Sequence, residues 1–180
     1  MKNTFSILAV VSMAILSAQS FAATSGTLSF TGKLTDNTCS VAINGAGTNA
    51  TIALPSVTVG ELDTAGKVSG RTKFTLALSG CSGASLAGAA AYFQSGSNVN
   101  SNGRLNNTGT ATNVDLQILD SSNSDTAINV GNADQLTNTT FVAVRAGGSI
   151  ALPYSVQYYA TGKAGAGDIA SSVTYNLIYN

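Results

Sequence analysis

Residues that could do acid–base, nucleophilic or metal chemistry are scarce in this sequence. The 180 residues include no histidine, two cysteines and eight carboxylates. Without histidine the most common general base is missing, and so are the serine and cysteine triads built on it. Paired carboxylates for glycoside hydrolysis can come from any part of a chain, but we interpret these scattered ones as solvated turn and edge residues. We therefore expect neither an enzyme nor a bound cofactor or metal.

The first 22 residues have the pattern of a secretory signal peptide. Lys2 supplies a positive start, residues 5–16 form an apolar run broken by two serines, and Ser20-Phe21-Ala22 is a small-x-small cleavage pattern. The run is shorter than the roughly 18 residues that a membrane-spanning helix needs. We expect an exported protein without membrane insertion, whose mature chain of 158 residues begins at Ala23, or at Thr24 if cleavage follows Ala23.

The two cysteines, Cys39 and Cys81, are expected to pair. An even number of cysteines in an exported chain predicts a disulfide, and a metal site would need more ligands than this sequence supplies. The bridge would close a loop of 43 residues. Chain entropy gives such a loop about 4 kcal/mol of stabilisation.

The charge of the chain argues against several classes of partner. Charged residues make up 9% of the sequence, and without Lys2 seven basic and eight acidic side chains remain, a net charge of −1. Nucleic acids and anionic membrane surfaces require a basic footprint. We therefore expect neither as a partner. The length of the mature chain fits a single domain.

The residue pattern predicts an almost entirely β protein. Short stretches of alternating apolar and polar residues are separated by turns rich in Gly, Asn and Ser, and no amphipathic helix is evident. This combination is typical of a β-sandwich. The expected strands cover residues 28–34, 40–43, 51–59, 72–78, 90–94, 114–119, 140–145, 154–161 and 172–179, with loops at 95–109 and 121–138.

The first strand has an unusual buried face. Leu28, Phe30, Gly32 and Leu34 share that face, although a glycine weakens a strand and has no side chain to pack. The pattern fits a bulged first strand of the same domain. It also fits a strand that joins another molecule, with Gly32 at a shallow place in the receiving groove.

The last strand is unusual for a different reason. Val173, Tyr175, Leu177 and Tyr179 alternate with less apolar residues, and no charge or proline interrupts them. Proteins normally protect an exposed strand edge with such residues. The strand is therefore either fully paired or left as an edge that a neighbour could use.

Several motifs then follow in one order along the mature chain. They are Gly26-Thr27-Leu28-Ser29-Phe30-Thr31-Gly32, Cys39, Cys81, Ala111-Thr112-Asn113-Val114, Gln117-Ile118-Leu119-Asp120, Tyr158-Tyr159-Ala160-Thr161-Gly162, Gly167 fourteenth from the end and Tyr179 in the penultimate position. Behind a signal peptide, this series resembles the pilins of the chaperone–usher pathway, most closely the major shaft subunits of type 1 fimbriae.

The resemblance implies an incomplete immunoglobulin-like β-sandwich that is completed by a donor strand from a neighbouring subunit. Residues 1–22 would be the signal peptide, 23–35 the donor-strand extension and 36–180 the pilin domain. Leu28, Phe30, Gly32 and Leu34 would enter the groove of a neighbouring copy. The receiving groove and its chaperone and subunit contacts would be formed by Gly167, Val173, Tyr175, Leu177, Tyr179 and Asn180.

The implied function is that of a structural subunit of an adhesive fimbria, at the cell surface. A periplasmic chaperone would fill the groove first and anchor the terminal carboxylate of Asn180. An outer-membrane usher would then exchange the chaperone strand for the extension of the next subunit and so build a homopolymeric shaft. Two alternatives are a minor adaptor pilin of the same pathway and a free secreted β-sandwich that binds a carbohydrate or protein ligand. Only Ala23, Thr24 and Ser25 precede Gly26, a shorter lead-in than this family normally has.

Overall fold

The computed structural model describes residues 27–29, 31–32, 34, 36–145 and 147–180. The chain divides into two units, residues 1–33 and residues 34–180. The expected signal peptide lies outside the described residues, and so does Phe30. The fold below is that of the second unit.

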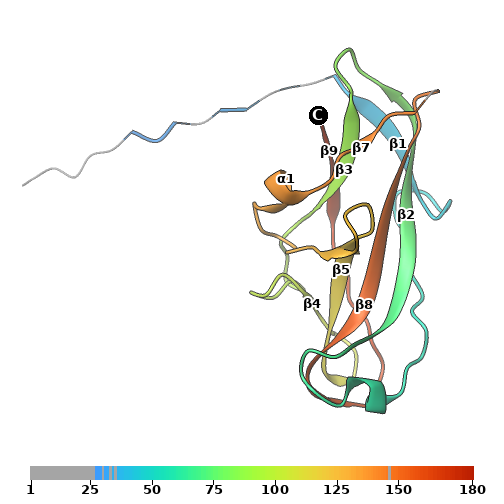
Figure 1. The fold of residues 1–180 in the computed structure, drawn as a ribbon, viewed down its shortest axis with the longest axis vertical. Helices are drawn as coiled ribbons and strands as arrows, with labels where there is room; N and C mark the ends of the chain where they lie inside the picture. The colour runs from blue at the N-terminus through green and yellow to red at the C-terminus, as the bar shows by residue number, and fades with distance from the viewer. Residues whose placement is uncertain (1–26, 30, 33, 35, 146) are drawn as a thin grey trace, which may run out of the picture. The chain divides into compact units, whose positions relative to one another are not determined.

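Regular structure in this unit is almost entirely β, as predicted, and Figure 1 shows the arrangement. No helix among the described residues is long and apolar enough to cross a bilayer. In chain order, the elements are β1 (Thr38–Ile43), the 3-10 helix η1 (Val59–Leu62), β2 (Val68–Ser82), β3 (Gly88–Phe93), β4 (Leu105–Asn106), β5 (Thr112–Asp120), β6 (Thr126–Ala127), α1 (Gln135–Asn138), β7 (Val142–Ala143), β8 (Ile150–Gly165) and β9 (Tyr175–Tyr179).

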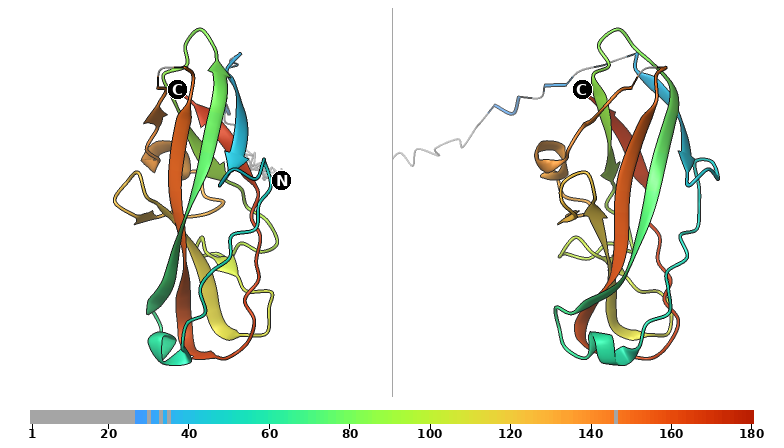
Figure 2. Two further views of the ribbon diagram at one scale, coloured as in Figure 1. Left: turned by 90° about the vertical axis from the view of Figure 1, so that its right-hand side faces the viewer. Right: turned by 45° about the vertical axis from the view of Figure 1, so that its right-hand side comes forward.

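The strands form two sheets, whose long central strands are clear in Figure 2. The larger sheet has the order β1-β2-β8-β5-β4, with β6 beside β5, and the smaller has the order β7-β3-β9. Every pairing between these strands is antiparallel. The longest ladder, between β2 and β8, runs from Val68 opposite Tyr159 to Leu78 opposite Ile150.

Side chains from both sheets form one core. Alternating residues of β2, β5 and β8 face it, as the period of two requires. Tyr154 of β8 packs its ring edge-on against Phe93 of β3, with centroids 5.1 Å apart at 90°, and it also lies 5.8 Å from Phe74 of β2. The contact between Tyr154 and Phe93 joins the two sheets, whereas Phe74 lies in the same sheet as Tyr154.

The disulfide predicted from the cysteine count is present. Cys39 of β1 is bonded to Cys81 near the end of β2, with their Cα atoms 4.2 Å apart. It therefore ties the edge strand of the larger sheet to the neighbour with which it already pairs.

The strand predicted at 51–59 is absent: residues 51–58 form no strand, and η1 begins at Val59. The predicted alternation is nevertheless present. Ile52, Leu54 and Val57 are half-buried, whereas Thr51 and Ala53 on either side of Ile52 are exposed. The segment pairs with no other described strand, and its Pro55 has no N–H to contribute to a ladder. The described residues of the strand predicted at 28–34 lie in no strand either.

Other boundaries differ in length. The strand expected at 140–145 is only Val142–Ala143, and the last strand begins at Tyr175 rather than at residue 172. The expected loops contain two-residue strands and the one-turn helix α1. The two-residue strands β4 and β6 each pair with β5, and elements this short are too brief for a residue pattern to reveal.

Candidate functional site

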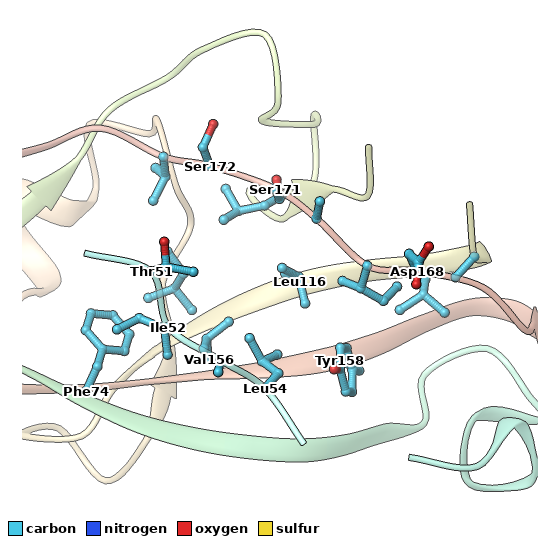
Figure 3. A pocket seen from close by; sticks show the side chains of 18 of the residues that line it. Thr51, Ile52, Leu54, Phe74, Leu116, Val156, Tyr158, Asp168, Ser171 and Ser172 are labelled. Atoms are coloured by element: carbon cyan, nitrogen blue, oxygen red, sulfur yellow. The ribbon is translucent and has the colours of Figure 1, made fainter. Parts of the chain in front are cut away.

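A groove with a volume of about 930 Å³ opens between two segments that lie mostly outside the strands. Residues 48–59 form one side, and residues 164–173 together with Tyr175 form the other. Figure 3 shows Ile52 and Leu54 on the first segment and Ser171 on the second, with Leu116 and Val156 between them. The floor consists of core side chains from both sheets, including Leu76, Phe93, Leu105, Leu116, Ile118, Val156 and Tyr158.

The first side of the groove has an unpaired backbone. Two of its carbonyls accept side-chain hydrogen bonds: that of Pro55 from the Tyr158 hydroxyl at 3.1 Å, and that of Thr48 from the Tyr175 hydroxyl at 3.0 Å. The remaining backbone groups of residues 49–57 bond to no other described residue. The backbone of this segment is therefore free to pair with an added strand, although the segment itself belongs to no sheet.

The second side is bonded on one face only. The carbonyls of Asp168, Ala170 and Thr174 accept hydrogen bonds from the backbone N–H groups of Ala111, Thr108 and Gln94, at 3.0, 2.7 and 2.8 Å. The backbones of residues 169, 171, 172 and 173 have no such partner among the described residues. Because successive residues of an extended chain direct their backbone groups to opposite sides, residues 169, 171 and 173 point away from the side bonded through Asp168, Ala170 and Thr174, and so toward the groove.

Strand β9 continues this second edge. It pairs with β3 on one side and is the last strand of its sheet. The groove is thus the place where one more strand would fit, between the β9 side and the segment that follows β1.

Gly167 is required for close packing beside the groove. A Cβ at this position would overlap the backbone of Ala111 and Thr110. The chain at 167–170 can therefore lie directly against residues 107–111, which holds the second edge in place.

The structure distributes the predicted groove residues over two places. Gly167, Val173 and Tyr175 line the groove. Leu177 and Tyr179 lie in β9, opposite Ala91 and Ala89 of β3, and pack against the core.

Asn180 lies beside the start of β3. Its backbone N–H donates to the carbonyl of Gly88 and its carbonyl accepts from the N–H of Ala87.

Sequence reasoning missed the lining residues Ile52, Leu54 and Val57, although the alternation around Pro55 was visible.

The described residues of the N-terminal extension are uncovered. Leu28 is 78% exposed and Leu34 is fully exposed. Gly32 is also exposed, and a Cβ built on it meets no atom within 4 Å.

The groove is suited to binding an apolar segment. Asp168, at one end, is the only ionisable carboxylate or basic residue among its lining residues. Burial raises the pKa of both Tyr158 and Tyr175, so their hydroxyls stay neutral and hydrogen-bonded. No group of three or more possible metal ligands occurs in the described part of the chain.

Known proteins with similar sequences are fimbrial subunits. The major fimbrial subunit SMF-1 of Stenotrophomonas maltophilia is 44% identical over 88% of this chain and 94% of its own. The F17 fimbrial protein of Escherichia coli is 39% identical over 93% and 96%. The fold is that of a pilin: the P pilus rod subunit PapA matches with a TM-score of 0.59 at 15% identity, over 79% of this chain and 99% of its own.

The sequence model of the family described as fimbrial protein matches residues 28–180, which include both the exposed row and the groove. The chain therefore belongs to the fimbrial protein family, the structural subunits that are exported and assembled into fimbriae on the cell surface.

Proposed function

We propose that this fimbrial subunit polymerises into a shaft by donor-strand exchange. In this mechanism, residues 23–35 of one copy extend away from its pilin domain, residues 36–180, and fill the groove of the next copy. The observation that supports the proposal is an apolar groove with an unpaired backbone on both sides. An inserted strand would pair with both edges and bury its apolar row on the floor.

The lengths of the three segments agree. Residues 51–57 and 169–175 are seven residues each, and so is the row from Leu28 to Leu34. At about 3.3 Å per residue, each spans roughly 23 Å. A strand of this length would therefore run beside both of these stretches, which lie within the longer sides of the groove, although Pro55 has no N–H to contribute.

The expected energy is sufficient for a stable joint. Burial of Leu28, Phe30 and Leu34 contributes about 1.5–3 kcal/mol each, or roughly 5–9 kcal/mol in all. Ordering of the extension reduces this gain, whereas backbone hydrogen bonds to two edges add to it. Each copy has one donor row and one groove, so head-to-tail addition can continue without limit.

The same groove explains why helper proteins would be needed. An unpaired edge over an exposed apolar floor is an aggregation hazard. We propose that a periplasmic chaperone fills the groove with a strand of its own after the signal peptide, residues 1–22, is removed. An outer-membrane usher would then be the place where the next copy's extension replaces that strand.

The test uses the mature chain, residues 23–180, and a synthetic peptide of residues 24–35. Refolding the chain alone should give oligomers, whereas refolding in excess peptide should give a monomer with a higher thermal midpoint. A peptide with Gly32→Phe serves as the matched control and should neither cap nor stabilise the chain. Size-exclusion chromatography with light scattering and a thermal melt measure the two effects.

The opposite result would favour a free secreted module. In that case the chain refolds to a monomer without peptide, and its thermal midpoint is the same with either peptide.

A further inference from the structure

The groove contains one buried polar atom that the described residues leave unsatisfied. The hydroxyl of Ser171 is buried and has no hydrogen-bond partner, and Ser171 lines the groove. A buried hydroxyl without a partner costs about 1–3 kcal/mol. The domain already bears this cost while the groove is empty, and an incoming strand removes it only if the Ser171 side chain turns about χ1 and pairs with the strand.

Ser171 belongs to a row of half-buried residues on the second edge. Ile169, Ser171, Val173 and Tyr175 alternate with exposed residues, and Ser171 is the small polar member of the row. The donor row has one member without a side chain, Gly32. Both rows have a period of two, so the register is fixed once the residue opposite Ser171 is known. Gly32 is the candidate for that position.

A second landmark lies at the end of the groove near β9. The Tyr175 hydroxyl donates to the Thr48 carbonyl at 3.0 Å and so joins the two edges there. Tyr175 is four residues from Ser171, and Leu28 is four residues from Gly32. With the strands antiparallel, as are all strand pairs of this fold, Gly32 opposite Ser171 places Leu28 beside Tyr175, where the groove is bridged.

We propose that Ser171 is a positioning residue that sets the register of the incoming strand, its hydroxyl bonding to the main chain at Gly32 of a second copy. The inference rests on the donor-strand function proposed above. Gly32 has no side chain to separate this hydroxyl from the donor backbone. The same register places Phe30 beside Val173 and Leu34 beside Ile169, apolar against apolar.

A slip by two residues would break this match. It would place Phe30 or Leu34 opposite Ser171 and leave the hydroxyl facing an apolar side chain, without a partner. A slip by one residue would turn the whole apolar row away from the floor. The register is therefore the one arrangement that satisfies both the hydroxyl and the apolar row.

The test is disulfide trapping in fibres of the full chain, at exposed positions on the opposite face of each row. The proposed register places Thr31 directly opposite Ser172 in a non-hydrogen-bonded pair, the closer kind. Such a pair approaches the Cβ spacing of a disulfide, whereas diagonal neighbours at about 7–8 Å do not. The native cysteines are already bonded to each other.

We expect T31C/S172C fibres to give a ladder of covalent oligomers on a non-reducing gel after mild oxidation. The controls T31C/A170C and T31C/T174C differ by a shift of two and should give at least tenfold less ladder. T31C/A170C also reports a parallel strand, because Gly32 opposite Ser171 in that direction pairs Thr31 with Ala170. A stronger ladder from either control would overturn the proposed register.

Ser171 itself is tested in the same assay. S171A removes the hydroxyl, and we expect the two control pairs to gain crosslinks relative to T31C/S172C, while S171T retains the hydroxyl and should restore the original preference. An unchanged preference in S171A would overturn the role of Ser171. Chains that yield no intermolecular crosslink with any pair and remain monomers would instead contradict donor-strand exchange.

Discussion

The two edges of the smaller sheet differ in whether their backbone groups have hydrogen-bond partners. Beyond the short strand β7, the free edge of β3 is closed by side chains of the same chain. The N–H of Ala91 donates to the Tyr154 hydroxyl at 2.9 Å, and the N–H of Phe93 donates to the Gln135 amide oxygen at 3.0 Å. The Gln135 amide nitrogen in turn donates to the Phe93 carbonyl at 3.0 Å.

The edge formed by β9 and residues 169–173 has no comparable closure. Among the described residues, only the Tyr175 hydroxyl reaches from this edge to the facing segment. The same domain thus has side chains that bond the free backbone groups of β3, whereas the backbones of residues 169, 171 and 173 have no such partner among the described residues. This difference is what we expect if the open edge receives the strand proposed above.

The largest effect should come from blocking the strand that we propose for the open edge. Gly32→Phe in the full chain should reduce surface fibres at least tenfold, because a bulky side chain would meet the second edge at Ser171. Electron microscopy and surface labelling with an antibody measure the fibres. Thr31→Phe, on the outward face of the same strand, is the matched control and should leave fibres at their normal level.

Fibres of normal number and length from the Gly32→Phe chain would mean that the open edge does not receive this strand. The folded state of the variant is checked by its disulfide and by circular dichroism of the peptide-capped monomer.

The next largest effect concerns the side of the groove that follows β1. Replacing both cysteines, Cys39 and Cys81, with serine should lower the free energy of unfolding by about 4 kcal/mol, because the unfolded chain regains the entropy of the closed loop. Urea unfolding of the peptide-capped monomer measures the change. A loss below about 1 kcal/mol would show that the ladder between β1 and β2 holds this strand without the covalent bond.

The closed edge should be sensitive to alkaline pH. Burial raises the pKa of Tyr154 to about 12 from its ordinary 10.0. The unfolded chain therefore ionises first as the pH rises above 10, and stability falls between pH 10 and pH 12. The shift corresponds to a loss of about 3 kcal/mol across that window.

Unfolding measured at several pH values from 9 to 12 tests this expectation. Tyr154→Phe should make the pH dependence shallower, and at pH 7 it should cost about 1–3 kcal/mol because the buried N–H of Ala91 loses its acceptor. An equally steep decline in the variant would assign the alkaline loss to the other tyrosines.

A smaller effect is expected at the second side chain on the closed edge. Gln135→Leu leaves the N–H of Phe93 without its acceptor, while the Phe93 carbonyl keeps the N–H of Gly131 at 3.0 Å, and should cost about 1–2 kcal/mol. Thr137→Leu, on the exposed side of the same one-turn helix, is the matched control and should change stability by less than about 0.5 kcal/mol. Fibres should persist in both variants, since neither residue touches the groove. A cost equal to that of the control would mean that β7 alone protects this edge.

Local residue patterns were sufficient for much of the fold. The alternation of Val114, Leu116 and Ile118 placed them on the buried face of a strand, and the pair of cysteines in an exported chain predicted the bond that joins β1 to β2. These features depend on residue type and a period of two, which are local properties. The strand predicted at 28–34 remains a prediction, because none of the described residues of that range lies in a strand.

Tertiary structure decided which edges were closed. The pattern at 51–58 predicts a strand, yet only the packed domain shows that the segment has no partner. The bonds from Tyr154 and Gln135 to β3 span 63 and 42 residues, and the unpaired hydroxyl of Ser171 is evident only once its surroundings are known. A sequence determines which residues favour an extended chain, whereas the presence of a neighbour depends on where distant segments meet in space.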